Sequence, residues 1–119
     1  MGVLIVDDTG FMRAKLAKML RENYVEIAGE AVDGKDAVKK YMELQPSVVT
    51  MDITMPEMDG VQAIKEIMKL DPRAKIIVCS AMGQESIVMD AIKAGAKSYL
   101  IKPIKEERLV TEILNIMKL

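Results

Sequence analysis

A run of four apolar residues ends in two adjacent carboxylates near the start of the chain, in the stretch Val3-Leu4-Ile5-Val6-Asp7-Asp8. The apolar part is short and rich in β-branched residues, which is typical of a strand buried on both faces. A second short run, Val48-Val49-Thr50-Met51, leads to Asp52 in the same way. Because the carboxyl ends of parallel strands meet at one edge of a sheet, this pattern predicts three carboxylates gathered at that edge.

The length and composition favour a single globular domain, which we expect to span residues 1–119, because 119 residues are too few for two separate cores. Hydrophobic residues make up 50% of the chain, but there are only one Phe, three Tyr and no Trp, so the core must consist mainly of aliphatic side chains and Met. The net charge of −1 argues against an anionic membrane as a partner. Together with the scarcity of aromatic residues, it also argues against nucleic acid.

The single cysteine, Cys79, excludes an intrachain disulfide and a multi-cysteine metal site. Its apolar neighbours, Ile76-Ile77-Val78, predict a buried core position. The start of the chain lacks a secretory leader pattern, and no segment approaches the length of a membrane span. We therefore expect a cytoplasmic protein. Since the chain has no His, any metal would be held by oxygen ligands.

Hydrophobic periodicity predicts five strands that alternate strictly with five helices. The predicted strands cover residues 3–6, 25–31, 48–52, 75–80 and 97–101. The predicted helices cover residues 9–21, lie between 33 and 46, between 60 and 71 and between 83 and 95, and surround 109–117. Two of the helices carry clear apolar stripes, formed by Ala37, Val38, Tyr41 and Met42 and by Ile87, Val88, Ala91 and Ile92.

This alternation predicts a doubly wound α/β fold, in which helices cover both faces of a parallel (βα)5 sheet as a three-layer sandwich. In such folds the ligand site lies outside the carboxyl ends of the strands. Five polar side chains fall at those ends: Asp7, Asp8, Asp52, Ser80 and Lys102.

Three converging carboxylates repel one another, by roughly 4 kcal/mol per close pair at an effective dielectric constant near 20. A hard divalent cation would neutralise them, because every available ligand is an oxygen atom. Mg²⁺ suits such a site best, since it keeps some water ligands and also binds phosphoryl oxygens, and Mn²⁺ is the alternative metal.

Lys102 would bring a positive charge to the other side of the same site. An aspartate held between a metal and a lysine can attack an activated phosphoryl donor, because both cations stabilise charge on the phosphoryl oxygens. Asp52 is the predicted nucleophile, since it stands alone at its strand end while Asp7 and Asp8 form a metal-holding pair. Ser80 supplies a hydroxyl that can donate to a phosphoryl oxygen. The site thus predicts phosphoryl transfer onto an aspartate.

These motifs resemble those of the receiver domains of two-component response regulators, and most of all those of single-domain chemotaxis regulators. The matching segments lie at residues 4–8, 51–60, 79–83 and 94–103, so the resemblance covers essentially the whole chain. It implies the flavodoxin-like fold of this family. It also implies a signalling phosphoacceptor, which catalyses its own phosphorylation and slow dephosphorylation, and not an enzyme with a separate substrate.

The resemblance further implies that Asp52 accepts a phosphoryl group from a phosphohistidine of a sensor histidine kinase. Asp8, Asp52 and the backbone carbonyl of Thr54 would ligate Mg²⁺, and Asp7 would act largely through bound water.

On the other side of the site, the same resemblance implies that Lys102 contacts the phosphoryl group and that the Lys102-Pro103 peptide bond is cis. Ser80 would be the switch hydroxyl, and Tyr99 would be the aromatic residue that follows it inward. The fourth helix, fifth strand and fifth helix would then bind a flagellar motor switch protein or another downstream protein. A phosphatase is a further implied partner.

Two alternatives stay open at this point. The chain could be a receiver domain of another two-component pathway or of a DNA-binding regulator, although it ends after the last helix without a linker, which favours a stand-alone regulator. A more remote alternative is an aspartate-nucleophile phosphatase. That class needs a second Asp two residues after the nucleophile, where this chain has Thr54.

Overall fold

The computed structural model describes residues 2–53, 55 and 59–119. The strands are β1 (Val3–Val6), β2 (Ile27–Ala31), β3 (Val48–Asp52), β4 (Ile76–Ser80) and β5 (Ser98–Ile101). The helices are α1 (Gly10–Glu22), α2 (Gly34–Leu44), α3 (Gly60–Leu70), α4 (Glu85–Ala94) and α5 (Glu106–Met117). The predicted alternation of strands and helices is confirmed.

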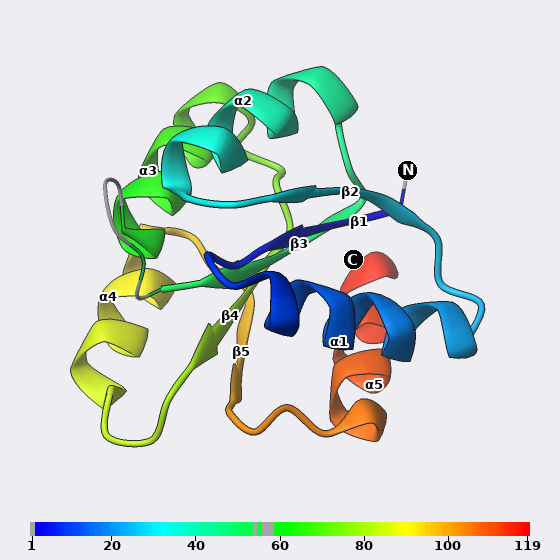
Figure 1. Cartoon of the computed structure of the whole chain (residues 1–119). Coiled ribbons are helices and arrows are strands. Elements are labelled where there is room, and N and C mark those ends of the chain that lie inside the picture. The colour runs from blue at the N-terminus through cyan, green and yellow to red at the C-terminus, as the bar shows by residue number, and fades with distance from the viewer. Residues whose placement is uncertain (1, 54, 56–58) are drawn as a thin grey trace.

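The strands form one parallel sheet in the order β2-β1-β3-β4-β5. Figure 1 shows α1 and α5 on one face of this sheet and α2, α3 and α4 on the other. The predicted doubly wound three-layer sandwich is therefore confirmed. The chain winds outward in opposite directions from the neighbouring strands β1 and β3, so the carboxyl ends of these two strands flank the point where ligands bind in such folds.

The sheet divides the hydrophobic interior of this single domain into two clusters, one on each face. Leu4, Met51 and Ile64 belong to the core beneath α2, α3 and α4. Ile5 and Ile113 belong to the core beneath α1 and α5. Successive residues of a strand point to opposite faces, so a strand that is covered on both faces is expected to be apolar at nearly every position. This explains why β1 is wholly apolar and why β3 and β4 carry polar residues only at Thr50 and at their last positions, Asp52 and Ser80.

Side-chain caps set the start of three helices. Thr9, Asp33 and Asp59 each accept a hydrogen bond, at 2.8–3.3 Å, from the backbone N–H three residues further along. Such a cap contributes about 1 kcal/mol to the stability of a helix. The cap at Thr9 makes α1 begin two residues after Asp8, which keeps both acids of the first stretch in the short turn above the sheet.

The second strand begins later than predicted, at Ile27 instead of Val25. The backbone N–H of Val25 donates to the carbonyl of Leu20 at 2.9 Å and so closes the end of α1. The preceding residue, Tyr24, has a left-handed backbone with a φ of 60°. Val25 is buried, but its amide belongs to this helix-terminal turn and not to the sheet.

The predicted apolar stripes are only partly buried. On α2, Ala37 and Tyr41 face the core, whereas Met42 is 52% exposed. On α4, Ile87 and Ile92 are 36% and 37% exposed. Ile87 borders a hollow between α3 and α4, so the packing of α4 leaves this flank of its stripe open.

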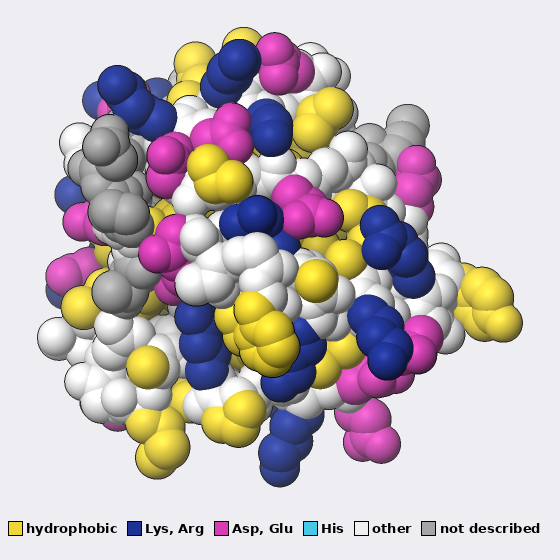
Figure 2. All heavy atoms as spheres, in the orientation of Figure 1, with side chains coloured by type: hydrophobic (Ala, Val, Ile, Leu, Met, Phe, Trp, Pro, Cys, Tyr) yellow, Lys and Arg dark blue, Asp and Glu magenta, His cyan; other side chains and the backbone are white. Residues whose placement is uncertain are grey.

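Charges of both signs are interspersed over the face that carries α1, with no broad field of one sign (Figure 2). This pattern agrees with the formal net charge of −1. None of the described helices combines the length and the hydropathy that a membrane crossing requires.

Replacing Tyr41 with Phe is expected to lower the free energy of unfolding by about 1 kcal/mol. The Tyr41 hydroxyl donates to Oδ2 of Asp71 at 2.7 Å, which ties α2 to the end of α3. Burial, the hydrogen bond to Asp71 and the charge of Asp71 all raise the pKa of Tyr41. Urea unfolding measures the loss, and Tyr24→Phe is the control because Tyr24 is 98% exposed. Equal losses in the two variants would contradict a role for this hydrogen bond.

The same contact predicts a pH dependence. The unfolded state loses the tyrosine proton near pH 10, about the ordinary pKa, whereas the folded state keeps it. The unfolded state then binds fewer protons, so stability falls as the pH rises above that value. We expect this alkaline loss to be smaller in Tyr41→Phe than in the wild type.

Replacing Thr50 with Val is expected to raise the free energy of unfolding by about 1 kcal/mol. Thr50 is buried in β3 between Ile5 of β1 and Ile77 of β4. Its hydroxyl oxygen finds no hydrogen-bond partner in the part of the chain that the structure describes. Val has nearly the same shape without a polar group to desolvate. Urea unfolding tests this, and a loss of stability as large as that of a cavity-forming Thr50→Ala variant would contradict it.

Candidate functional site

Three carboxylates meet at the carboxyl edge of the central strands. Asp7 directly follows β1 and Asp52 ends β3, and these strands pair as neighbours with Val6 opposite Met51. One oxygen atom from each of Asp7, Asp8 and Asp52 lies within 4.8 Å of the other two. Asp7 and Asp52 are buried, whereas Asp8 is exposed. The structure thus brings together the acids that the strand-end pattern predicts.

Asp7 is oriented from several sides. Its backbone N–H donates to the carbonyl of Ala31 at 3.1 Å. Its Oδ1 accepts hydrogen bonds from the backbone N–H of Thr9 at 2.9 Å and from the Thr9 hydroxyl at 3.0 Å. One carboxylate oxygen of Asp7 therefore accepts two hydrogen bonds from Thr9, and the other, Oδ2, is the oxygen that pairs with Lys102.

Lys102 supplies the positive charge of the site. Its ammonium nitrogen lies 3.7 Å from Oδ2 of Asp7 and 3.6 Å from Oδ1 of Asp52. At these distances the two contacts are ion pairs and not short hydrogen bonds. The backbone N–H of Lys102 donates to the carbonyl of Ser80 at 2.7 Å, and the Lys102-Pro103 bond is cis, as predicted. The ammonium group offsets part of the repulsion among the carboxylates.

Ser80 and Tyr99 differ in their relation to this cluster. Ser80 ends β4 and is buried, and its hydroxyl oxygen has no hydrogen-bond partner among the described residues. Tyr99 lies on β5 and is 46% exposed, so its ring is not packed inward in this structure. Both residues border a hollow of about 160 Å³ beside α4.

The carboxylates open onto a hollow of about 280 Å³. Its lining includes Thr9, Met12 and Gln84, which the sequence pattern did not single out. Gln84 precedes α4 and its Oε1 accepts a hydrogen bond from the backbone N–H of Ala81 at 2.6 Å. The helix start after Gly83 is the only sequence signal that could have placed Gln84 near the site.

The donor set fits a hard divalent cation. The three carboxylates offer oxygen atoms within reach of one centre, and the unpartnered Ser80 hydroxyl lies at the end of the next strand. Within the described residues, no second group of three or more acidic, His or Cys side chains could hold a metal. The predicted ligand at Thr54 lies outside the described residues.

Cys79 is not part of this donor set. It is buried in the core beneath α1 and α5, as predicted. The pKa of its thiol is raised to about 12, mainly by burial; Lys102 lowers this pKa, and the charges of Asp52 and Asp7 raise it. The thiol therefore stays protonated at neutral pH and is neither a metal ligand nor a nucleophile.

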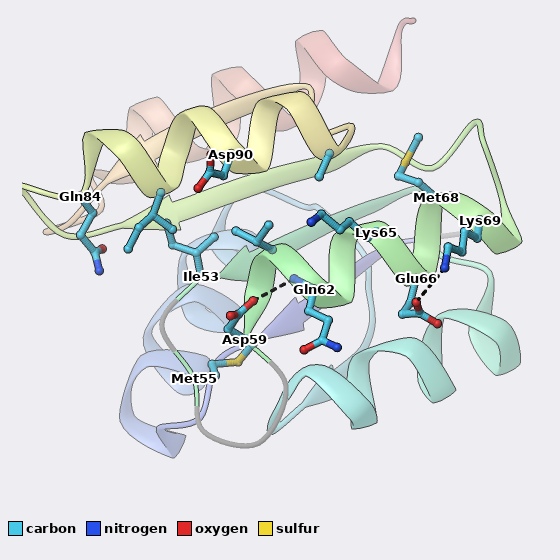
Figure 3. Close-up of a pocket in the computed structure, with 13 residues that line it drawn as sticks. Ile53, Met55, Asp59, Gln62, Lys65, Glu66, Met68, Lys69, Gln84 and Asp90 are labelled. Atoms are coloured by element: carbon cyan, nitrogen blue, oxygen red, sulfur yellow. Dashed lines mark hydrogen bonds and ion pairs between the residues drawn. The ribbon is translucent and has the colours of Figure 1, made fainter.

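A larger hollow, of about 990 Å³, lies between α3 and α4 (Figure 3). Lys65 on α3 and Asp90 on α4 stand on its opposite walls. The carboxylate of Asp59 caps α3, and Glu66 pairs with Lys69 at 3.4 Å. The charges on this lining are of both signs and do not converge on one centre, unlike the three carboxylates of the smaller hollow.

Comparison with known proteins identifies the family. The model of the response regulator receiver domain matches residues 3–114. The chain is 58% identical to the chemotaxis protein CheY of Thermotoga maritima over 98% of this chain and 97% of that protein.

Two solved structures agree. The CheX–CheY–BeF3–Mg²⁺ complex from Borrelia burgdorferi matches with a TM-score of 0.90 and 36% identity, over 96% of this chain and 87% of that one. The response regulator domain of Thermotoga maritima CheB matches with a TM-score of 0.91 and 36% identity, over 98% and 96%. The chain belongs to the response regulator receiver domain family, as a chemotaxis response regulator of the CheY type.

Proposed function

We propose that this protein is a phosphorylation-activated switch, a single receiver domain that accepts a phosphoryl group on Asp52 in a Mg²⁺-dependent reaction. The observation that carries the proposal is the position of the Asp52 carboxylate, which is buried, 3.6 Å from the Lys102 ammonium and within 4.8 Å of two further carboxylates. A buried nucleophile between cationic partners is the arrangement that phosphoryl transfer requires.

Asp8 and Asp52 would hold the metal directly, with the backbone carbonyl of Thr54 as a third protein ligand. Asp7 would act largely through bound water, as the family resemblance implies; its Oδ1 accepts hydrogen bonds from Thr9 and its Oδ2 lies 3.7 Å from the Lys102 ammonium. When bound, Mg²⁺ would draw negative charge from the carboxylates and from the phosphoryl oxygens.

The protein's own residues perform the transfer. A carboxylate oxygen of Asp52 attacks the phosphorus atom of a kinase phosphohistidine, so that an O–P bond forms while the N–P bond breaks. The electron pair of the broken bond leaves with the imidazole. Lys102 stabilises the charge on the phosphoryl oxygens, and the Ser80 hydroxyl donates a hydrogen bond to one of them. The kinase is thus the phosphodonor, and this domain catalyses its own phosphorylation and slow dephosphorylation.

The surface formed by α4, β5 and α5 would bind the downstream protein that receives the signal. Movement of Ser80 toward the phosphoryl group would let Tyr99 turn from its exposed position into the hollow that both residues border. Met89 on α4 and Ile101 on β5 are exposed beside Tyr99 and would provide apolar contacts for a downstream protein. We expect that protein to be a component of the flagellar motor switch, in the cytoplasm. A phosphatase of the kind named in the Borrelia burgdorferi complex is a further expected partner.

The test is phosphorylation of the purified protein by a small phosphodonor, followed by intact-mass measurement. The expected result is a mass gain of one phosphoryl group that requires Mg²⁺ and disappears in excess chelator. A full gain with chelator would contradict the metal role, and no gain with Mg²⁺ and a phosphodonor that labels other receiver domains would contradict the proposal as a whole. Pull-downs with and without beryllofluoride then separate a motor switch partner from partners in other pathways.

A further inference from the structure

Arg13 on α1 bonds directly to the backbone that carries the acid pair. Its Nη1 donates to the carbonyl oxygen of Asp7 at 2.9 Å, and its Nε donates to Oε1 of Glu30 at 3.1 Å. Glu30 lies on β2, opposite Ile5 of β1. The Arg13 side chain is only 18% exposed, so this fork joins α1, the end of β1 and β2 in one partly buried contact.

The carbonyl that Arg13 holds belongs to the peptide group between Asp7 and Asp8. Because a peptide group is planar, fixing this carbonyl restricts the direction in which the Asp8 side chain leaves the backbone. The Asp8 carboxylate is exposed and has no hydrogen bond or ion pair within the described part of the chain. Its aim toward the other two carboxylates therefore depends on its backbone.

We propose that Arg13 is a positioning residue for the metal site formed by Asp7, Asp8 and Asp52. Arg13 holds the carbonyl of Asp7 and thereby orients the Asp8 carboxylate. The inference rests on the proposed function, because it assigns Asp8 to a metal. The other contacts of Asp7, to Ala31, Thr9 and Lys102, hold its backbone N–H and its carboxylate and not the peptide group that leads to Asp8. Arg13 is thus the side chain that bonds to the linking peptide.

The charge of Arg13 alone would have the opposite effect. A cation beside three carboxylates competes with a second cation, so a purely Coulombic Arg13 would weaken Mg²⁺ binding. Removing it would then tighten binding. A positioning role predicts that removal weakens binding. The sign of the change in affinity therefore separates the two effects.

The experiment is calorimetric titration of the full chain with Mg²⁺, without any phosphodonor. Arg13→Ala is expected to bind Mg²⁺ about tenfold more weakly than the wild type, as for other partners that orient a metal ligand. Arg21→Ala is the matched control, because it removes the same charge from an exposed position at the other end of α1. It is expected to bind like the wild type.

Two further variants sharpen the test. Arg13→Lys keeps the charge, but its single ammonium cannot reproduce the fork to Asp7 and Glu30, so it is expected to bind Mg²⁺ more weakly than the wild type. In an Asp8→Ala background, Arg13→Ala is expected to cause no further loss, because the ligand that it orients is gone. Arg13→Lys also keeps the inference testable if Arg13→Ala does not fold.

The outcomes are distinct. Wild-type or tighter Mg²⁺ binding by folded Arg13→Ala or Arg13→Lys would overturn the positioning role and leave the proposed function intact. An equal loss from Arg13→Ala with and without Asp8 would also overturn it. Failure of the wild-type protein to bind Mg²⁺ would overturn both this inference and the metal-dependent reaction on which it rests.

Discussion

Asp52→Asn is expected to reduce phosphoryl acceptance by more than about a thousandfold while the fold survives. An amide nitrogen cannot replace the attacking carboxylate oxygen, and the amide oxygen carries too little charge to act as the nucleophile. The change keeps the shape of the side chain, so the packing at the end of β3 is preserved. Intact-mass measurement after incubation with a phosphodonor and Mg²⁺ gives the extent of labelling.

The matched control for this change is Asp59→Asn. Asp59 is exposed and caps α3 through its Oδ1, a role that Asn performs equally well. This variant is expected to be labelled like the wild type. Labelling of Asp52→Asn at the wild-type rate would remove Asp52 from the mechanism and would point to another acid of the cluster as the phosphoacceptor.

Thermal unfolding adds an independent readout of the same substitution. Asp52 lies near two like charges and forms an ion pair with Lys102, so neutralising it relieves two repulsions and weakens, among its favourable contacts, this ion pair. In the absence of metal, the melting temperature of Asp52→Asn is therefore expected to equal or exceed that of the wild type. A protein that fails to label because it is unfolded would show the opposite change.

The fold could be predicted because its signals are local and repeated. The strand Val3–Val6 is apolar at every position, and Ile76–Ser80 is apolar up to its last residue, which requires cover on both faces and leaves few arrangements other than a parallel sheet with helical crossovers. The predicted elements differ from the observed ones at their ends. The start of β2 was misplaced because the amide of Val25 closes a helical turn, an interaction that no apolar pattern reveals.

The acid cluster could also be predicted, since strand ends converge whatever the details of packing. The positions of Asp7, Asp8, Asp52 and Lys102 follow from this rule. The cis geometry of Lys102-Pro103 came from family resemblance and is present in the structure.

Arg13 could not be found in the same way. It is one of several cations on α1, and its importance depends on a side chain that reaches from a helix to the carbonyl of a neighbouring strand. Tyr99 presents a related difficulty. The family resemblance implies that Tyr99 is the aromatic switch residue that moves inward, whereas in this structure Tyr99 is exposed.

Asp8→Ala is expected to weaken Mg²⁺ binding by at least the roughly 10- to 100-fold that the loss of an outer-shell partner causes, because it removes a direct ligand. Phosphorylation at limiting Mg²⁺ should slow in proportion and recover partly at high Mg²⁺. Calorimetric titration measures the affinity, and labelling at a series of Mg²⁺ concentrations measures the recovery. Asp90→Ala is the control, since Asp90 is an exposed acid on α4 outside the cluster.

Asp8→Ala should be more stable than the wild type without Mg²⁺ and less stable than the wild type with Mg²⁺. Without Mg²⁺, the loss of one carboxylate from a repelling group is expected to raise the melting temperature of Asp8→Ala. With Mg²⁺, the wild type gains stability in proportion to the logarithm of metal concentration over its dissociation constant, and the variant gains little. The melting temperature of Asp8→Ala should therefore lie above that of the wild type without Mg²⁺ and below it at high Mg²⁺. Parallel curves at every Mg²⁺ concentration would show that Asp8 is not a ligand.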